Sequence, residues 1–222
     1  EGRHAVWLAG LGWAGPAVRA IMREFCGWQG CPVHMIASNG TSDFAGRGGL
    51  YGSGGHRGSG GTTVMSGLRL DAANVEYFRL KVGGRLQRER GYAVTEIRLP
   101  GHQGVGFVSM HLSLDADERA RHAAAIMEAL DGDGPLVVAG DLNEGPDGQA
   151  WVSIAKRLGV VTGDAPTFPA GNPRHRLDAI FASAKLSVVP GGPIELDPRD
   201  LVAATDHLPV WVDLDLSGVA LR

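Results

Sequence analysis

The chain has 222 residues, a formal net charge of −3 and 44% apolar residues. This length allows one domain with a substantial core, and no uninterrupted apolar run reaches the roughly 18 residues that a transmembrane helix needs. The slightly acidic balance argues against a protein that coats nucleic acid through bulk positive charge.

The first part of the chain is predicted to hold one helix, one strand and one long loop. The spacing of apolar residues predicts a helix over residues 14–25, and residues 33–37 form a strand candidate. Nine of the sixteen residues in 46–61 are glycine, which loses the most entropy on ordering and has no side chain to bury. We expect a flexible loop there, either a surface insertion or a mobile flap near a substrate.

Two cysteines, Cys26 and Cys31, lie between the first helix and the first strand. Their spacing suits neither a Cys-x-x-Cys redox site nor a zinc site, which would need further ligands nearby. A disulfide in an oxidising compartment and two buried free thiols both fit the pattern. The sequence therefore leaves the compartment open.

The rest of the chain is rich in strands. β-branched or alternating runs predict strands at 62–65, 76–81, 92–99 and 105–110, and again at 177–181, 186–189 and 210–214. Residues 115–130 form the clearest helix, with Asp115 and Glu118 in a capping-box arrangement and Gly132 as its stop. A wholly apolar strand at 136–139 and a helix at 149–158 follow. This mixture predicts an α/β (α+β) sandwich with sheets in the middle.

Basic residues outnumber acidic ones by seven to four between residues 69 and 98. Such a stretch forms either one wall of an anion-binding cleft or a solvated strand-and-loop surface, and both interpretations stay open. The basic residues are Arg69, Arg79, Lys81, Arg85, Arg88, Arg90 and Arg98.

The strongest candidate site follows the apolar strand at 136–139. After Gly140 the chain presents Asp141 and Asn143, whose side chains share one face of an extended segment. A carboxylate beside an amide oxygen suits a hard cation such as Mg²⁺ or Mn²⁺ and a polarised water. The alternative is an Asx turn that closes the strand.

Three further polar clusters lie at predicted strand ends. Asp206 could bind a metal and His207 could carry a proton, although a loop with a surface histidine would look the same. Asp178 lies within an apolar strand, where a carboxylate is costly unless it is paired. We expect His207 as its partner, with a salt bridge to an arginine such as Arg176 as the alternative. His111 ends another strand, where a lone histidine is more often structural than catalytic.

Together these segments strongly resemble, in order and spacing, the endonuclease/exonuclease/phosphatase superfamily with its deoxyribonuclease-I-like fold. The resemblance covers residues 60–216. The matching segments are Ser109–Leu112, Gly140–Asn143, Arg176–Phe181 and Thr205–Val210, with further support from Thr167–Pro169 and Gly61–Ser66.

The resemblance implies a four-layer sandwich of two mixed β-sheets packed face to face, with helices outside. In the site it implies that Asp141 and Asn143 help to hold a metal-bound nucleophile and the scissile phosphate. Asp178 would orient His207, which contacts the phosphate or moves a proton. Asp206 would belong to the metal site and His111 would line the cleft. The implied reaction is hydrolysis of a phosphoester, in nucleic acid or in a small phosphorylated molecule, with Mg²⁺ or Mn²⁺.

The match departs from the family at its start. The family has an asparagine on its first strand and a metal-binding glutamate on an early strand, and residues 1–59 show neither pattern at a strand end. Asn39 and Asp43 are weaker substitutes. We therefore expect a single domain over residues 1–222 that is N-terminally incomplete and lacks the first strands. The alternative function is a catalytically impaired member of the same fold that binds a phosphorylated ligand or a protein partner.

Overall fold

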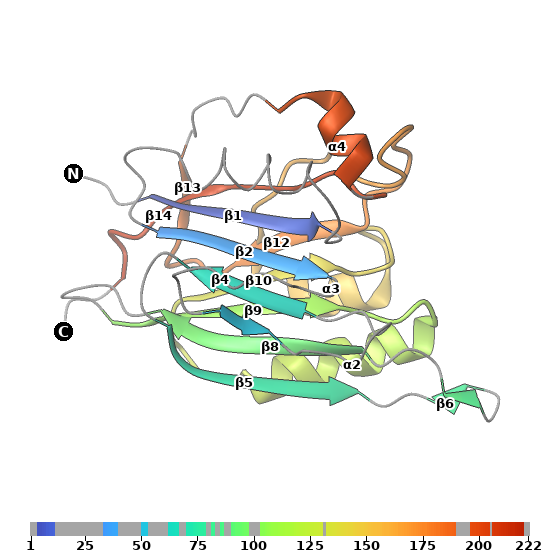
Figure 1. Cartoon of the computed structure of the whole chain (residues 1–222). Coiled ribbons are helices and arrows are strands. Elements are labelled where there is room, and N and C mark those ends of the chain that lie inside the picture. The colour runs from blue at the N-terminus through green and yellow to red at the C-terminus, as the bar shows by residue number, and fades with distance from the viewer. Residues whose placement is uncertain are drawn as a thin grey trace.

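The computed structural model describes a two-sheet sandwich with helices against one of its faces (Figure 1). Side chains are described from residue 103 onward and at several positions of the strand before it, and elsewhere the backbone alone is described. The described residues are 4–11, 33–39, 50–52, 62–66, 70–78, 81–82, 85–86, 90–97, 103–130, 132–189, 196–204 and 206–219.

The two sheets have six strands each and the same pattern of strand directions. In both, the third and fourth strands are parallel, and the other neighbours are antiparallel. The first sheet runs β13 (Ser187–Val189), β14 (Asp213–Asp215), β1 (His4–Leu11), β2 (Val33–Asn39), β4 (Thr62–Ser66), β3 (Leu50–Gly52). The second runs β11 (Gly159–Val160), β12 (Asp178–Ala182), β10 (Leu136–Asp141), β9 (Val105–His111), β8 (Arg90–Ile97), β5 (Leu70–Phe78).

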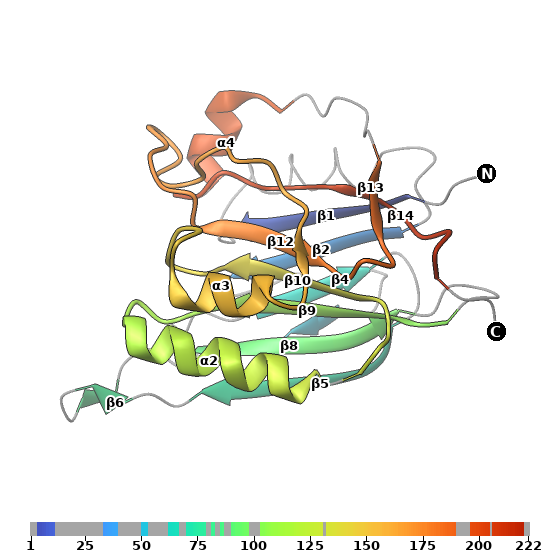
Figure 2. The ribbon, with the colours of Figure 1, turned by 180° about the vertical axis from the view of Figure 1, so that it is seen from behind.

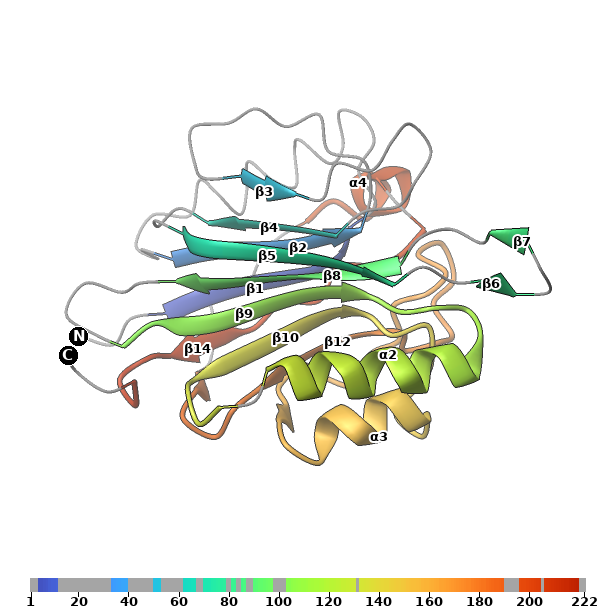
Figure 3. The ribbon, with the colours of Figure 1, turned by 90° about the horizontal axis from the view of Figure 1, so that it is seen from below.

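The sheets lie face to face, with β1 and β2 against β9 and β10. The helices α2 (Ala116–Ala129) and α3 (Gln149–Ala155) cover the outer face of the second sheet (Figures 2 and 3). A third helix, α4 (Pro198–Ala204), lies above β1 and β12 in the view of Figure 2, at the opposite end of the sheets from β13. The hairpin of β6 (Lys81–Val82) and β7 (Arg85–Leu86) projects away from the sandwich (Figure 3).

Alternation along β10 divides the core into two layers. Val137 and Ala139 point between the sheets, where they join Phe107 and Leu214. Val138 points to the other face, toward the helices and their buried side chains. Because both faces are covered, β10 is apolar throughout until it reaches Asp141.

The predicted fold class is confirmed: two mixed sheets form the centre and helices lie outside. The predicted helix over 14–25, both cysteines, Asp43 and most of the glycine-rich loop lie outside the described residues. No helix in the described part of the chain is long and apolar enough to cross a membrane.

Several elements differ from the sequence prediction. Within the glycine-rich stretch, where we expected no packed element, β3 pairs with β4 through backbone groups, which need no side chains. Residues 4–11 form the central strand β1, although no strand was predicted there. The short elements β7, β11 and α4 were not predicted either. Whether further strands precede Glu1 stays a prediction.

Other boundaries shift by a few residues. The strand predicted at 76–81 is divided, because β5 ends at Phe78 and Lys81 belongs to the projecting hairpin. The last strand begins at Asp213 instead of Val210. Before it, the chain runs beside residues 162–167, and the backbone N–H of Leu208 donates to the carbonyl of Thr167.

Half of the predicted capping box forms at the start of α2. The side chain of Asp115 accepts from the backbone N–H of Glu118 at 3.0 Å, as expected for an N-cap. The carboxylate of Glu118 instead accepts from the hydroxyl of Ser113 at 2.7 Å. This contact ties the helix start to the end of β9.

Candidate active site

Four adjacent strands of the second sheet bring the candidate residues to one end. Gly91 of β8 faces His111 of β9, His111 faces Asp141 of β10, and Asp141 faces Asp178 of β12. Strand pairing alone therefore aligns three of the residues predicted from sequence. The fourth, His207, comes from the loop after α4.

Gly140 lets β10 lie close to β9 just before the site. A Cβ atom at this position would fall 1.9 Å from the carbonyl oxygen of Met110, and the φ of 154° is one that side-chain-bearing residues rarely adopt. The glycine of the Gly-Asp-Leu-Asn segment is thus a steric requirement for placing Asp141 beside His111.

The Asx-turn alternative for Asp141 and Asn143 is confirmed, and the expectation of an extended segment with both side chains on one face is wrong, because the chain turns at Asn143. The carboxylate of Asp141 accepts the backbone N–H of Asn143 through Oδ1 at 2.8 Å, which is an Asx turn. Asn143 takes a positive φ of 53°, and its Nδ2 donates to the carbonyl of Leu112 at 2.9 Å. The turn therefore fixes the amide of Asn143 and leaves Oδ2 of Asp141 to face the site.

Asp178 and His207 form a hydrogen-bonded pair at the end of β12. His207 Nδ1 lies 2.8 Å from Asp178 Oδ2, so the nitrogen donates to the carboxylate. The hydroxyl of Thr167 donates to the same oxygen at 2.5 Å, while its own oxygen accepts the backbone N–H of Leu177 at 3.2 Å. Asp178 is fully buried, and its Oδ1 has no hydrogen-bond partner among the described residues.

The arginine alternative for Asp178 is wrong. Arg176 instead lies over the ring of Trp151, 4.9 Å from its centroid, and pairs with the exposed carboxylate of Asp164 at 2.8 Å. Its Nη2 also donates to the carbonyl of Thr162. The arginine is thus directed away from the site, and the carboxylate is left to the histidine.

The loop that carries His207 is held by a ring contact and by backbone hydrogen bonds. The ring centroids of Phe168 and His207 lie 4.8 Å apart with the rings tilted by 46°, and the N–H of Ala170 donates to the carbonyl of Asp206 at 2.7 Å. With Nδ1 engaged by Asp178, the other ring nitrogen, Nε2, lies 3.9 Å from Asp141 Oδ2. These contacts orient the imidazole toward the centre of the site.

His111 approaches the same carboxylate oxygen from the other side. Its Nε2 lies 3.3 Å from Asp141 Oδ2 and 2.5 Å from Nη1 of Arg90. Arginine can only donate, so His111 Nε2 is the acceptor in this contact. The guanidinium of Arg90, which is always charged, is thus separated from Asp141 by the imidazole of His111.

Burial and neighbouring charges shift two pKa values toward neutral and alkaline pH. Burial raises the pKa of Asp141 to about 7, and the charge of Asp178 adds to this, while His207, the N–H of Asn143 and Arg90 act against it. Burial lowers the pKa of His207, but its hydrogen bond to Asp178 and the charges of Asp178, Asp141 and Asp206 outweigh burial and raise it to about 9. Between these values Asp141 is a carboxylate and His207 is a cation.

Part of this cluster fits a hard cation. Potential metal-ligand atoms within 4.8 Å of one another come from Asp141, Asp178 and His207. This is the group of such ligands in the described part of the chain. Within it Asp178 Oδ2 already accepts two hydrogen bonds, so Asp141 is the better ligand. Asp206, expected at the metal site, is exposed and does not belong to this group.

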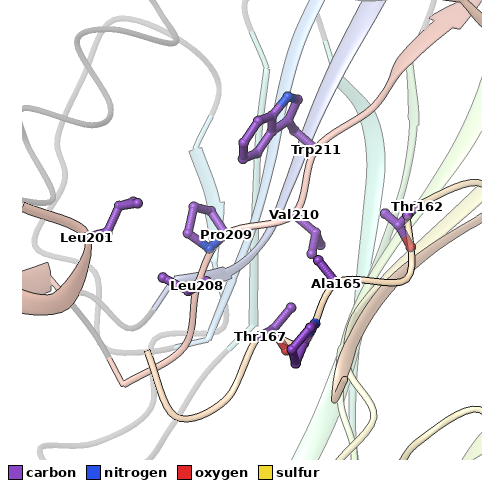
Figure 4. A pocket seen from close by; sticks show the side chains of 10 residues that line it. Thr162, Ala165, Thr167, Leu201, Leu208, Pro209, Val210 and Trp211 are labelled. Atoms are coloured by element: carbon purple, nitrogen blue, oxygen red, sulfur yellow. The ribbon is translucent and has the colours of Figure 1, made fainter. Parts of the chain in front are cut away.

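An apolar groove of about 320 Å³ borders the site (Figure 4). Thr167 and Leu208 line it, and both adjoin residues of the site. The remaining lining residues are Thr162, Gly163, Ala165, Pro166, Leu201, Pro209, Val210 and Trp211. The groove lies between the segment that carries Thr167 and the segment that follows His207. The backbone hydrogen bond from Leu208 to Thr167 joins the two segments.

Sequence reasoning did not single out three residues of this site. Thr167 and Phe168 supported the resemblance without a role, and Arg90 was one of seven basic residues on a possible cleft wall. The Thr-Phe-Pro segment was a usable signal for the first two. Arg90 had no local signal, because its importance depends on pairing between β8 and β9.

A family model described as Endonuclease/Exonuclease/phosphatase family matches residues 3–207. The chain belongs to the endonuclease/exonuclease/phosphatase family. A comparison with curated protein sequences gives no match. The likeness to solved structures adds evidence on the fold alone, because the sequence identities are low.

Three solved structures illustrate this likeness. An endonuclease/exonuclease/phosphatase from Beutenbergia cavernae is 21% identical with a TM-score of 0.70, over 96% of this chain and 72% of that one. One from Bacteroides vulgatus is 16% identical with a TM-score of 0.73, over 96% and 99%. A mannosyl-6-phosphatase from Bacteroides thetaiotaomicron is 14% identical with a TM-score of 0.61, over 96% and 99%.

Proposed function

We propose that this chain is a divalent-metal-dependent hydrolase of phosphoester bonds. The observation that carries the proposal is the sequence of contacts from Asp178 through His207 to Asp141. In the proposal His207 Nε2 is the proton donor, and Asp141 Oδ2, 3.9 Å away, is the proton acceptor. Membership of the family supports phosphoester hydrolysis in general.

In this proposal His207 protonates the leaving oxygen or binds a phosphoryl oxygen. Its Nδ1 is engaged by Asp178, and its raised pKa of about 9 keeps the ring protonated at neutral pH. Asp141, with a pKa of about 7, can accept a proton from the attacking water. Between the two pKa values one group is a carboxylate and the other a cation, which suits paired base and acid roles.

Asp141 and Asn143 would hold the Mg²⁺ or Mn²⁺ ion. Carboxylate and amide oxygens are the donors that these cations prefer. The bound ion would supply positive charge for the phosphoryl oxygens and lower the pKa of water. Asn143 is suited to this because the bond from its Nδ2 to Leu112 fixes the side-chain amide.

A small phosphomonoester is the first substrate to test. The chain has a net charge of −3, which does not favour a long polyanion, and one protein of similar fold is described as a mannosyl-6-phosphatase. Nucleic acid is the second substrate class to test, because its hydrolysis follows the same chemistry.

The direct test is hydrolysis of p-nitrophenyl phosphate and of its diester analogue with Mg²⁺ or Mn²⁺. We expect EDTA to abolish the activity, and Asp141→Ala and His207→Ala to reduce it by about 10³-fold. Asp164→Ala, at an exposed carboxylate, is the matched control and should retain activity. Full activity in both site variants would refute the proposal.

The alternative is a member of the family that binds a phosphorylated ligand or a protein without turnover. Its motivation is the small donor set that the described residues offer an ion. Calorimetric titration with Mg²⁺ and Mn²⁺ separates the two functions. No binding at millimolar metal would favour the alternative, whereas binding abolished by Asp141→Ala would favour the hydrolase.

A further inference from the structure

Glu144, the residue after Asn143, is bonded to both helices that cover the second sheet. Its Oε2 accepts from Nε of Arg119 on α2 at 2.8 Å, and its Oε1 accepts the backbone N–H of Trp151 on α3 at 2.9 Å. The side chains of Arg119 and Glu144 are only 13% and 9% exposed. An ion pair this far from water is costly to break from one side, because the remaining charge stays buried without its partner.

The start of α3 depends on this carboxylate. Gly148 is the N-cap of α3 and has no side chain to accept a backbone N–H, so Glu144 accepts that of Trp151 in its place. A Cβ atom on Gly148 would collide with the carboxyl group of Glu144. The glycine thus leaves the space that the Glu144 side chain fills.

Arg119 joins the same carboxylate to the segment that follows β9. Its Nη1 donates to the carbonyl of Leu114 at 2.8 Å and to that of Ser113 at 3.2 Å. Both residues come shortly after His111, which ends β9. Arg119 therefore ties the chain after His111 to the chain after Asn143.

The turn at Asn143 needs such support. Its φ of 53° is a conformation that residues with a side chain keep only where the surrounding structure fixes it. The bonds from Asn143 to Asp141 Oδ1 and to the carbonyl of Leu112 hold the turn from within, and Glu144 holds the chain that leaves it. If Glu144 is released, the N–H of Asn143 can leave Asp141, and the carboxylate of Asp141 can then rotate.

We propose that the Arg119–Glu144 ion pair positions the Asn143 turn and, through it, the carboxylate of Asp141 for the reaction. Both are positioning residues, because they act on the site through the backbone of the turn. The inference rests on the proposed hydrolysis of phosphoesters, in which Asp141 and Asn143 hold the metal. It goes beyond that proposal in assigning a role to a pair of charges outside the site.

The first test measures the turn itself, by amide hydrogen exchange and mass spectrometry in the presence of EDTA. Arg119→Met removes the charge and keeps the aliphatic stem, so the amides of residues 142–144 should exchange about tenfold faster than in the wild type. The matched control is Arg157→Met, which should leave this exchange unchanged. Arg157 also donates to backbone carbonyls, but near the other end of α2, and these are the carbonyls of Met127, Leu130 and Gly132.

The second test separates positioning from stability. With Mn²⁺ and p-nitrophenyl phosphate, Arg119→Met should raise the metal concentration for half-maximal activity by about tenfold and should also lower kcat. KM for the phosphoester should change little, because the pair acts on the residues that would hold the metal. Arg157→Met should keep all three constants at the wild-type values, even where its midpoint of urea unfolding falls as far as that of Arg119→Met.

Gly148→Ala is an independent variant that removes no charge. Its methyl group takes the space of the Glu144 carboxyl group, while alanine suits the φ of −71° at this position. It should change the exchange of the turn and the metal constant in the same direction as Arg119→Met. It therefore also tests the proposal if Arg119→Met does not fold.

Wild-type exchange at residues 142–144 in both Arg119→Met and Gly148→Ala would overturn the proposal. A loss of activity in Arg119→Met no larger than that in Arg157→Met, at equal stability, would overturn it as well.

Failure of this inference is distinguishable from failure of the proposed function. If the wild type hydrolyses nothing but both variants speed exchange at the turn, the hydrolase is refuted and the pair still positions the turn. If the wild type hydrolyses phosphoesters and both variants keep its kinetic constants, the positioning role alone is refuted.

Discussion

The two halves of the site, around Asp178 on β12 and around Asp141 on β10, differ in how completely their polar groups are held by hydrogen bonds. On the β12 side, Asp178 is fully buried and one of its oxygens accepts from both Thr167 and His207. On the β10 side, Asp141 has one oxygen fixed by a backbone N–H, and the other lies 3.3 Å from His111 Nε2 and 3.9 Å from His207 Nε2. Two aspartates paired across neighbouring strands therefore have different surroundings.

The difference has a physical basis in the partners that each strand end offers. The loop 167–170 and the loop 206–208 bond to each other through their backbones and enclose the end of β12. The segment after β10 turns sharply at Asn143, and Oδ2 of the buried Asp141 faces His111 and His207. We call the Asp178–His207 pair the closed half of the site, because in the proposed reaction it orients a proton carrier. The Asp141 side is the open half, because in the proposed reaction its second oxygen changes its ligand.

The largest effect should follow Asp178→Asn, which keeps the contact to His207 but removes the negative charge. The asparagine cannot stabilise the protonated ring, so kcat should fall by roughly 10²–10⁴-fold. KM should change little, because Asp178 is fully buried. Steady-state kinetics measure both, with Asp164→Asn as the control. A variant within threefold of wild-type kcat would show that the pair is only structural.

The next effect concerns pH and the open half. If Asp141 accepts the proton, activity should rise with pH through about 7 and fall through about 9, where His207 loses its proton. At pH 5 the loss in kcat/KM should be about 100-fold, since a group of this pKa is then about 1% ionised. A metal on Asp141 competes with the proton, so more Mg²⁺ should move the acid limb to lower pH. A flat profile between pH 5 and 9 would remove both assignments.

A smaller effect is expected at Asn143, where side chain and backbone can be separated. Asn143→Gly keeps the positive φ and removes the amide, so activity should fall by about tenfold and metal binding should weaken. Asn143→Ala should in addition lower the free energy of unfolding by roughly 1 kcal/mol, because alanine is strained at φ 53°. Kinetics and urea unfolding test the two parts. Equal unfolding curves for the two variants would contradict the strain argument.

The smallest effect should come from the support behind Asp178. Thr167→Val removes the hydroxyl that donates to Asp178 Oδ2 but keeps the branched shape. We expect a loss of about 1 kcal/mol in stability and a several-fold fall in kcat. Thr167→Ser keeps the hydroxyl and should behave nearly as the wild type. If valine and serine give the same kcat, Thr167 does not position the pair.

The sequence by itself determined the residues that meet at the end of the second sheet. Asp141, Asn143 and His111 follow or end apolar strands, and such patterns depend only on neighbours in the chain. An aspartate inside the apolar segment at Asp178 demanded a partner, and His207 was the expected one, with an arginine as the alternative. The structure places His207 Nδ1 2.8 Å from Asp178 Oδ2. The family resemblance, carried by the same short segments, is confirmed by the match over residues 3–207.

Only the tertiary structure decided which atoms act together. It directed Arg176 to Asp164 and away from Asp178, left Asp206 exposed, and brought Arg90 to His111 across two strands. It also found the central strand β1, whose apolar run could equally belong to another buried element. Contacts such as these depend on strand pairing and loop packing between residues far apart in the chain, which local periodicity does not encode. The closed pair at Asp178 and the open carboxylate at Asp141 are therefore results of the fold.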